Sequence, residues 1–430
     1  MDALLVALGS HGDVHPLVGI GLALRERGHR VRVVANPYFR SLIEREGLGF
    51  IPVGTEADYR RMATNPAFWR RLQGTREVLP WVASAVRPVY EIVTQNHVPG
   101  ETVVVASSLG LGARVAQDRL GIPTASVHLQ PSIFLSAIDP PRLGGIVTPR
   151  WMPMWIKRRQ VATVDRVCDP LVGPELNALR REVGLPPVTR VMTEYLHSPQ
   201  RVIGVFPAWF GLPAADWPRQ ARLTQFPLYD ERGVSPMSDD LRRFLDEGDP
   251  PIAFTPGSAM WSGHQFFAES ARACELLGRR GLLLSRHPDH LPRRLPPGVR
   301  QVPYAPFSEL LPRCAAIVHH AGIGTSAQAL RAGIPQLATP FAHDQHDNAA
   351  RMMRLGVAAK VEPRAYRAGG VAARLRAMLE CEEVKSHCRA IARWFDGIDS
   401  MEETCELIEE LVVSDFDLSR DESHIRLMLP

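Results

Sequence analysis

The chain has 430 residues, 45% of them hydrophobic and 22% charged, which is typical of globular proteins and excludes a mostly disordered chain. A domain usually takes about 100–200 residues, so we expect two domains. The formal net charge is only +4, which gives no support for a nucleic-acid partner.

Neither secretion nor a membrane span is expected. No run approaches ~20 apolar residues, and no basic segment precedes the first predicted strand. The six cysteines are scattered, without CxxC pairs or histidine pairs at metal-ligand spacing. These features favour the reducing cytoplasm and argue against a zinc site.

The first elements follow the pattern of a parallel sheet. Residues 4–8 form an apolar run that predicts a buried strand. Residues 17–27 place apolar side chains on one face, which predicts an amphipathic helix that Gly28 ends. Residues 31–35 predict the next strand, so this region reads as a βαβ unit.

The same alternation continues along the chain, interrupted by a proline-rich segment over 207–250 that predicts a linker and loops. Further strands are expected at 102–106, 124–129, 202–206, 252–255, 281–285, 315–319 and 336–339, and helices at 112–120, 264–277 and 324–332. The predicted fold class is therefore α/β, with two doubly wound parallel domains in tandem.

Residues 150–166 combine cationic side chains with large apolar ones. Trp151 and Trp155 stand beside Met residues and are followed by three consecutive cations from Lys157. Such a segment can touch a membrane surface. The interpretation that we favour is a helix that lines an apolar pocket or packs on its domain.

The sharpest local signal is His319-His320-Ala-Gly322-Ile-Gly324-Thr325-Ser326, at the predicted junction of a strand and a helix. Backbone N–H groups at a helix start are unpaired and favour anions. The two glycines let an anion approach the backbone, and the hydroxyls add donors. The segment therefore predicts a phosphate cradle, although a glycine pair of this kind also occurs in simple tight turns.

A second polar cluster, with Asp344 and Gln345, follows the predicted strand at 336–339. Open α/β sheets bind ligands at this edge, and these two side chains suit neighbouring sugar hydroxyls. The alternative is that Asp344 only caps a helix. The nearby His343, His346 and Asp347 give poor support for a metal site.

These motifs resemble the donor-binding signature of the UDP-glycosyltransferase superfamily. The matching segments are Tyr304-Ala-Pro-Phe, the cradle, Gly333-Ile-Pro and the Asp344-Gln345 pair. The opening Gly9-Ser-His-Gly-Asp-Val-His-Pro, followed by Gly28-His29, resembles the bacterial and fungal branch, which includes sterol glucosyltransferases, rhamnolipid-type rhamnosyltransferases and antibiotic glycosyltransferases.

The resemblance implies the GT-B fold, in which two Rossmann-like domains face each other across a cleft. We expect an acceptor-binding domain over 1–225, a linker over 226–245 and a nucleotide-sugar-binding domain over 246–390. The remaining residues 391–430 would form a helix that crosses back to the first domain, plus a tail.

The resemblance also implies roles for individual residues. Tyr304 stands where the family has a Trp that stacks on the nucleotide base, and Gln328 where plant members carry a ribose-binding Glu. Asp344 and Gln345 match the residues that hold the donor sugar. The implied diphosphate contacts are Ser258, His320, Gly322, Gly324 and Thr325.

Asp13 is the candidate catalytic base, because the bacterial branch often places Asp at this point of the first strand–helix loop. Glycosyl transfer needs a base for the acceptor's proton. A free Asp, with a pKa of ~3.9, is a weak base unless burial raises that pKa. His11 or His15 on the acceptor side could be the base instead, or Asp13 could only cap the following helix.

The predicted function is an inverting, metal-independent hexosyltransfer from a UDP- or dTDP-sugar, with UDP-glucose as first choice, and no resident cofactor. The acceptor would be a lipophilic small molecule: a sterol, polyphenol, polyketide or hydroxy-fatty lipid. Its pocket would draw on residues 60–170, including Trp69, Trp81, Phe134, Trp151 and Trp155. The alternatives are a nucleotide-sugar epimerase and a non-catalytic nucleotide-sugar or lipid-binding protein. We expect a cytoplasmic protein, with peripheral membrane contact as an option, and leave its oligomeric state open.

Overall fold

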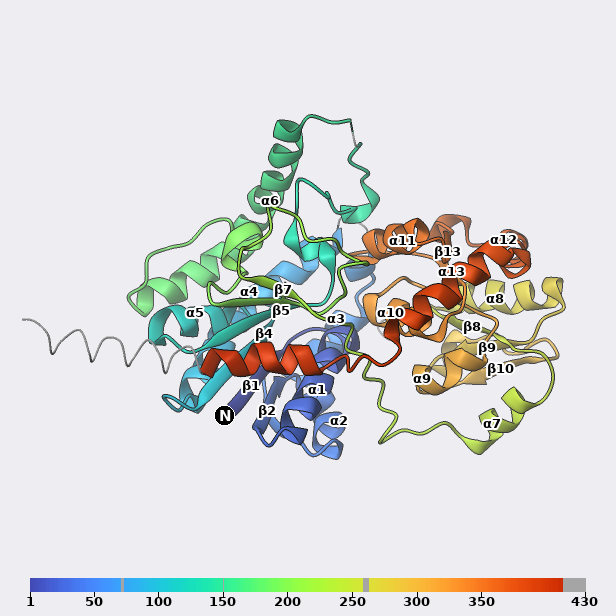
Figure 1. The fold of residues 1–430 in the computed structure, drawn as a ribbon, viewed down its shortest axis with the longest axis horizontal. Coiled ribbons are helices and arrows are strands. Elements are labelled where there is room, and N and C mark those ends of the chain that lie inside the picture. Colours follow the sequence, from blue (N-terminus) through green and yellow to red (C-terminus); the bar gives the residue numbers. More distant parts are fainter. Residues whose placement is uncertain (71–72, 150, 258–262, 413–430) are drawn as a thin grey trace, which may run out of the picture.

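The computed structural model describes residues 1–70, 73–149, 151–257 and 263–412. Within them the chain forms two parallel sheets side by side, each covered by helices (Figure 1). The predicted α/β class with two doubly wound domains is confirmed. Ser258 and the tail from residue 413 lie outside the described residues.

The first sheet has seven parallel strands in the order β3-β2-β1-β4-β5-β6-β7. Leu5 of β1 lies opposite Val33 on one side and Val105 on the other, and all three are fully buried. The strand order reverses beside β1, which is where open sheets bind ligands. The strands are β1 Asp2–Ala7, β2 Arg30–Ala35, β3 Gly49–Pro52, β4 Thr102–Ser107, β5 Thr124–His128, β6 Arg201–Gly204 and β7 Ala221–Leu223.

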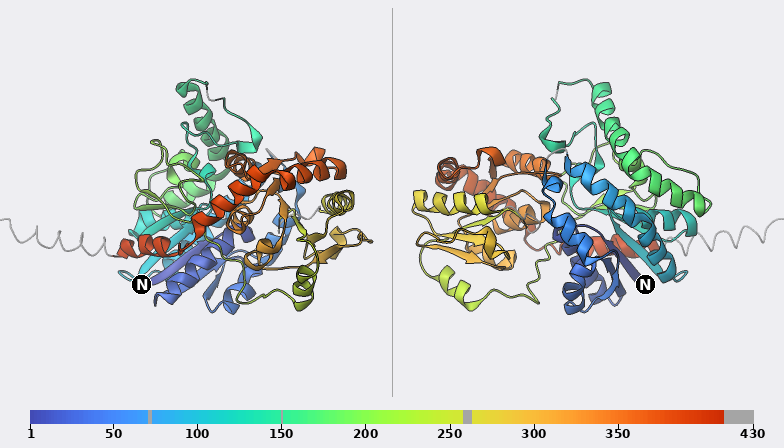
Figure 2. Two further views of the ribbon diagram at one scale, coloured as in Figure 1. Left: turned by 45° about the vertical axis from the view of Figure 1, so that its right-hand side comes forward. Right: turned by 180° about the vertical axis from the view of Figure 1, so that it is seen from behind.

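The helices of the first domain pack on both faces of this sheet (Figure 2). They are α1 His11–Glu26, α2 Arg40–Arg45, α3 Glu56–Thr64, α4 Gln73–Asn96, α5 Leu111–Leu120 and α6 Met154–Glu182. Helix α1 begins six residues earlier than predicted, because Ser10 and Asp13 form a capping box at its start. Asp13 therefore lies in the first turn of a helix, and its predicted position in a loop is wrong.

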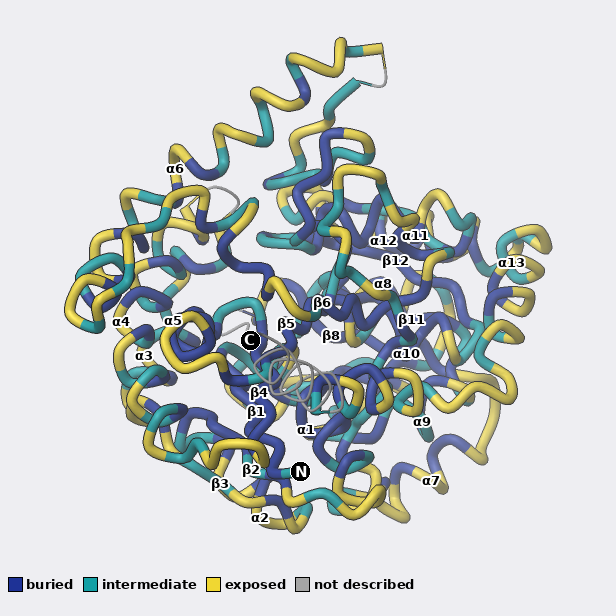
Figure 3. Tube along the Cα trace, turned by 60° about the vertical axis from the view of Figure 1, so that its left-hand side comes forward, coloured by how far each residue is buried: buried dark blue, intermediate teal, exposed yellow. Residues whose placement is uncertain are grey.

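The second sheet has six parallel strands in the order β10-β9-β8-β11-β12-β13, with the predicted strands at its centre. Its strands are β8 Ile252–Thr255, β9 Gly281–Leu284, β10 Val299–Val302, β11 Ala316–His319, β12 Gln336–Ala338 and β13 Ala358–Lys360. Its helices are α7 Asp239–Asp246, α8 His264–Leu277, α9 Phe307–Leu310, α10 Ile323–Ala332, α11 Gln345–Arg354, α12 Ala368–Glu380 and α13 Glu382–Ala392. Buried residues follow the strands of both sheets, whereas the outer helices carry the exposed ones (Figure 3).

A last helix, over residues 402–412, packs on the first domain. Glu409 lies 2.7 Å from both Arg27 and His29, and the hydroxyls of Thr404 and Thr224 are 2.8 Å apart. Ile408 of this helix is fully buried in the core that surrounds α1. The helix over residues 402–412 is thus part of the first domain's core.

The N-terminal half of α6 projects away from the rest of the molecule (Figure 1). The side chains of Trp151 and Trp155 are 83% and 61% exposed, so neither packs on its domain. Among the described residues, no helix has the length and apolar character that a membrane span requires. Membrane-surface contact by this segment stays a prediction.

Candidate active site

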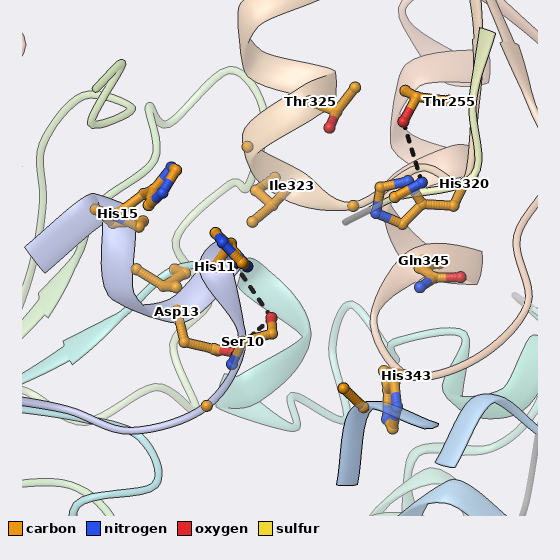
Figure 4. A pocket seen from close by; sticks show the side chains of 18 of the residues that line it. Ser10, His11, Asp13, His15, Thr255, His320, Ile323, Thr325, His343 and Gln345 are labelled. Atoms are coloured by element: carbon orange, nitrogen blue, oxygen red, sulfur yellow. Dashed lines mark hydrogen bonds between the residues drawn. The ribbon is translucent and has the colours of Figure 1, made fainter. Parts of the chain in front are cut away.

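A cavity of about 510 Å³ lies between the two domains, at the C-terminal edges of both sheets. Figure 4 shows His11, Asp13 and His15 on one side of it, and Thr325, His320 and Gln345 on the other. The structure thus brings together residues that are more than 300 positions apart. The predicted site residues that line the cavity are His11, Asp13, His15, Tyr304, His320, Gly322, Gly324, Thr325, Gln328, Asp344 and Gln345.

Asp13 both caps α1 and faces the cavity. The backbone N–H and the hydroxyl of Ser10 donate to its Oδ2, at 2.7 and 3.1 Å. Burial raises the pKa of Asp13 to about 6, although the bonds from Ser10 act in the opposite direction. Because both bonds end on Oδ2, Oδ1 has no hydrogen bond from the described residues and is left for a ligand. The cap and the base are therefore compatible roles for one side chain.

The two histidines of the first turns of α1 differ in their surroundings. Burial, together with the neighbouring His15 and Arg286, lowers the pKa of His11 to about 3. The imidazole of His11 lies 3.3 Å from the Tyr59 hydroxyl and against aromatic rings. Nε2 of His15 lies 3.3 Å from a carboxylate oxygen of Glu231. His11 is thus neutral and a weak base near neutral pH.

His320 is held at the start of α10 by two glycines. A Cβ on Gly322 would lie 2.3 Å from the His320 ring, and one on Gly257 would lie 2.9 Å from it. Burial lowers the pKa of His320 to about 4, and its Nδ1 is buried without a hydrogen-bond partner among the described residues. A neutral imidazole with an unpartnered nitrogen can donate to a ligand oxygen.

Helix α10 begins at the cavity without a side-chain cap. Gly322 is its N-cap residue and supplies no side chain, so the first N–H groups of the helix are free for an anion. Ser326 is not one of the donors, because its hydroxyl donates to the Gly322 carbonyl at 2.9 Å. His319 is also structural: it is fully buried, and its Nε2 lies 3.0 Å from Gln336.

Asp344 is the N-cap residue of α11 and Gln345 its first residue, and Gln345 lies on the same side of the cavity as His320 (Figure 4). Asp344 makes no cap hydrogen bond; Asn348 donates to its Oδ2 at 2.5 Å. Burial raises the pKa of Asp344 to about 7, and the charge of Asp13 contributes to this rise. The side-chain oxygen of Gln345 accepts from the N–H groups of Phe341 and Ala342. Only its amide N–H₂ therefore remains for a ligand.

Tyr304 and Gln328 are tied to the segment between the domains. The Tyr304 hydroxyl donates to the carbonyl of Asp230, and the Gln328 amide donates to the carbonyl of Leu228 at 3.0 Å. The side-chain oxygen of Gln328 is buried and has no hydrogen-bond partner among the described residues. It is thus an acceptor that is free for a ligand hydroxyl.

The apolar part of the cavity is lined by only some of the aromatic residues that were predicted to line it. Trp69 and Trp81 line it, together with Met62, Phe68, Val78 and Ile133. Phe134 is instead buried in the first domain's core, where its ring stacks on Trp217 at 4.0 Å. The two exposed tryptophans near the start of α6 do not line the cavity, so their predicted place in the pocket is wrong.

Two groups at the cavity were missed from the sequence. Arg286 lines it two residues after β9 ends. Ser108 lines it after β4, and its hydroxyl lies 2.8 Å from His128, which in turn lies 2.9 Å from His197. A polar residue directly after a predicted strand is the signal that could have found both. Within the described ranges no cluster of three or more His, Cys, Asp or Glu could hold a metal ion.

The fold and the site together define a class of protein. Two parallel α/β domains face each other across the cavity. One side carries an uncapped helix start and a neutral histidine, and the other carries a carboxyl with a raised pKa. This is the architecture of GT-B glycosyltransferases. Residues 3–135 match the family model described as "Glycosyltransferase family 28 N-terminal domain". Residues 283–393 match "Erythromycin biosynthesis protein CIII-like, C-terminal domain".

Similar proteins agree with these matches. The chain is 31% identical over 423 residues to O-mycaminosyltylonolide 6-deoxyallosyltransferase of Streptomyces fradiae, covering 95% of this chain and 97% of that relative. The glycotransferase of kitacinnamycin has a TM-score of 0.73 at 19% identity, covering 96% of this chain and 99% of that one. Glycosyltransferase VinC in complex with dTDP has a TM-score of 0.69 at 20% identity, with 96% and 100% covered.

The chain belongs to the antibiotic glycosyltransferase branch of the UDP-glycosyltransferase superfamily, and it is a glycosyltransferase. This confirms the resemblance seen in the sequence.

Proposed function

We propose that the protein transfers one hexosyl group from a nucleoside-diphosphate sugar to a hydroxyl of a lipophilic small molecule, with inversion at the anomeric carbon. The observation that carries this proposal is the opposition of Asp13 to the uncapped start of α10 and to Asp344 across one cavity. This cavity offers a base for an acceptor, donors for a leaving diphosphate and a carboxyl for sugar hydroxyls.

Each step uses groups that face the cavity. Asp13 takes the proton of the acceptor hydroxyl as its oxygen attacks the anomeric carbon. The bond to the diphosphate oxygen breaks, and the nucleoside diphosphate leaves with the bonding electron pair. The N–H groups at the start of α10 and the imidazole of His320 stabilise its charge, with the Thr325 hydroxyl as a further donor. Direct displacement from the opposite face inverts the anomeric configuration.

We favour a thymidine nucleotide over UDP, which was the first choice from the sequence. Tyr304 would stack on the base. The unpartnered side-chain oxygen of Gln328 would accept from a hydroxyl of the nucleotide sugar ring. The solved relative VinC is in complex with dTDP, and the Streptomyces relative is named as a 6-deoxyallosyltransferase. Asp344 and the amide of Gln345 would hold the hydroxyls of the sugar, and no metal ion or resident cofactor takes part.

The acceptor would lie against the apolar wall that contains Trp69 and Trp81. Among sterols, polyphenols, polyketides and hydroxy-fatty lipids, the names of the relatives favour an antibiotic-type natural product. A nucleotide-sugar epimerase would convert the donor without an acceptor, and a non-catalytic binding protein would leave both unchanged. We keep the cytoplasm as the expected location.

The test begins with thermal stabilisation by dTDP, UDP, GDP and ADP without metal, since a ligand that binds only the folded state raises the melting temperature. Transfer is then measured by mass spectrometry with dTDP-glucose or UDP-glucose and O-mycaminosyltylonolide as a probe acceptor, alongside other natural-product aglycones. Stabilisation by dTDP together with a product one hexose heavier supports the proposal. A protein that none of the four nucleotides stabilises contradicts it, and so does donor conversion without an acceptor.

A further inference from the structure

The cavity contains few positive charges for the ligand that the proposed function assigns to it. A nucleoside-diphosphate sugar carries two negative charges, and the leaving nucleoside diphosphate carries more. Burial lowers the pKa values of His11 and His320 to about 3 and about 4, so both are neutral. Asp13 and Asp344 add acidic groups to the same space. Among the described lining residues, Arg286 is the single lysine or arginine.

Arg286 reaches the cavity from the end of β9 and is 47% exposed. Its guanidinium carbon lies 4.7 Å from the centre of the Tyr304 ring, and its Nη2 lies 3.4 Å from Oε1 of Glu231. The planar guanidinium has five N–H donors, so most of its hydrogen-bonding capacity is left after this one contact.

Glu231 holds Arg286 loosely, because its carboxylate is shared with two other side chains. Its carboxylate also lies 3.3 Å from His15 and 3.8 Å from Arg45. Burial alone would raise the pKa of Glu231, but the contacts with His15 and Arg286 outweigh it and lower the pKa to about 2. Glu231 therefore stays ionised, and it keeps His15 and Arg45 as neighbours when Arg286 turns to another anion.

We propose that Arg286 binds the phosphate groups of the donor nucleotide, exchanging its contact with Glu231 for a charge-assisted pair with a phosphate oxygen. This inference rests on the proposed function, which supplies the nucleotide. Its place beside Tyr304 puts the cation next to the residue that would stack on the base. Arg286 would then provide the fixed positive charge that the neutral histidines do not.

The test separates contacts to phosphate from contacts to the base. Affinities for thymidine, dTMP and dTDP are measured by calorimetric titration or by displacement of dTDP, for the wild type and for Arg286→Gln. Arg300→Gln is a matched control, because Arg300 lies 4.5 Å above the Phe244 ring and 3.2 Å from Asp240 but does not line the cavity.

We expect Arg286→Gln to weaken dTDP binding by about 10- to 100-fold and dTMP binding by less. Thymidine binding should change by less than about twofold, and Arg300→Gln should bind all three ligands like the wild type. Arg286→Lys keeps the charge and should retain part of the dTDP affinity, which also checks the result if the glutamine variant folds poorly.

Equal losses for all three ligands would overturn the inference, since they would indicate a contact with the base or a structural role. Unchanged dTDP affinity in Arg286→Gln would overturn it too, while leaving the proposed function intact. If the wild type binds dTDP no better than thymidine, the phosphate cradle itself fails, and the proposed function falls together with this inference.

Discussion

Replacing Asp13 by Asn is the sharpest test of the catalytic proposal, because it separates activity from stability. The amide cannot accept the acceptor's proton, so we expect transfer to fall by about 10²–10⁴-fold. Affinity for dTDP should not change, since Asp13 lies across the cavity from Thr325 and His320 (Figure 4). The amide oxygen can still accept from Ser10, which preserves the start of α1.

The same substitution should not destabilise the protein near neutral pH. Burial raises the pKa of Asp13 from 3.8 to about 6, so between these values the folded protein binds more protons here than the unfolded chain. Its free energy of unfolding therefore falls as the pH rises through this window. A difference of about 2 in pKa corresponds to at most about 3 kcal/mol, and partial exposure reduces it to about 1–3 kcal/mol. The neutral Asn side chain avoids this loss of folding stability above about pH 6.

Two assays check these expectations. Rates of transfer to the acceptor found in the screen are measured against pH, and kcat/KM of the wild type should fall about tenfold per pH unit below about pH 6. Unfolding by denaturant is compared for both proteins near pH 4 and near pH 8, where the gain from Asn should appear only at the higher value. Transfer by the variant within about tenfold of wild type, or an acidic limb near pH 4, would refute the reasoning.

Three further predictions concern the donor site and the metal. Gly322→Ala should weaken dTDP binding by about 10-fold or more, because its Cβ would displace His320, whereas Gly369→Ala, in α12 with open space at its Cβ and outside the cavity lining, should bind normally in the same titration. Asp344→Asn should lower kcat/KM for the sugar donor while leaving dTDP affinity unchanged; a parallel loss of dTDP affinity would place the side chain on the nucleotide instead. Saturating EDTA should leave the transfer rate unchanged, and a loss restored by Mg²⁺ would contradict metal independence.

The sequence pattern predicts the centre of each sheet better than its edges. Strands such as β1 and β11 are buried on both faces and appear as continuous apolar runs. The edge strands β3 and β13 are short and have no fully buried residue, so the sequence shows no apolar run that would predict them. The start of α1 was also not predicted, because its first turn is polar. Its capping box uses Asp at the position where Glu is usual.

The sequence predicted which residues form the candidate site, but not which of their polar atoms are available to a ligand. The resemblance pointed to residues that do line one cavity. It could not indicate that the side-chain oxygen of Gln345 accepts a hydrogen bond from its own loop, or that the Ser326 hydroxyl donates to the carbonyl of Gly322. Nor did it point to Arg286, whose proposed role follows from the charges that surround it. These properties depend on packing between segments that are distant in sequence.

The docking of residues 402–412 on the first domain decides how this protein could be recombined with its relatives. A chimera that takes the whole C-terminal half from another enzyme would replace Thr404 and Glu409 while keeping Thr224, Arg27 and His29, and would thus mismatch a buried contact and a cluster of charges. An exchange of the second domain that ends before residue 402 keeps that helix with the domain on which it packs. The second domain could then be swapped between enzymes without cutting through the first domain's core.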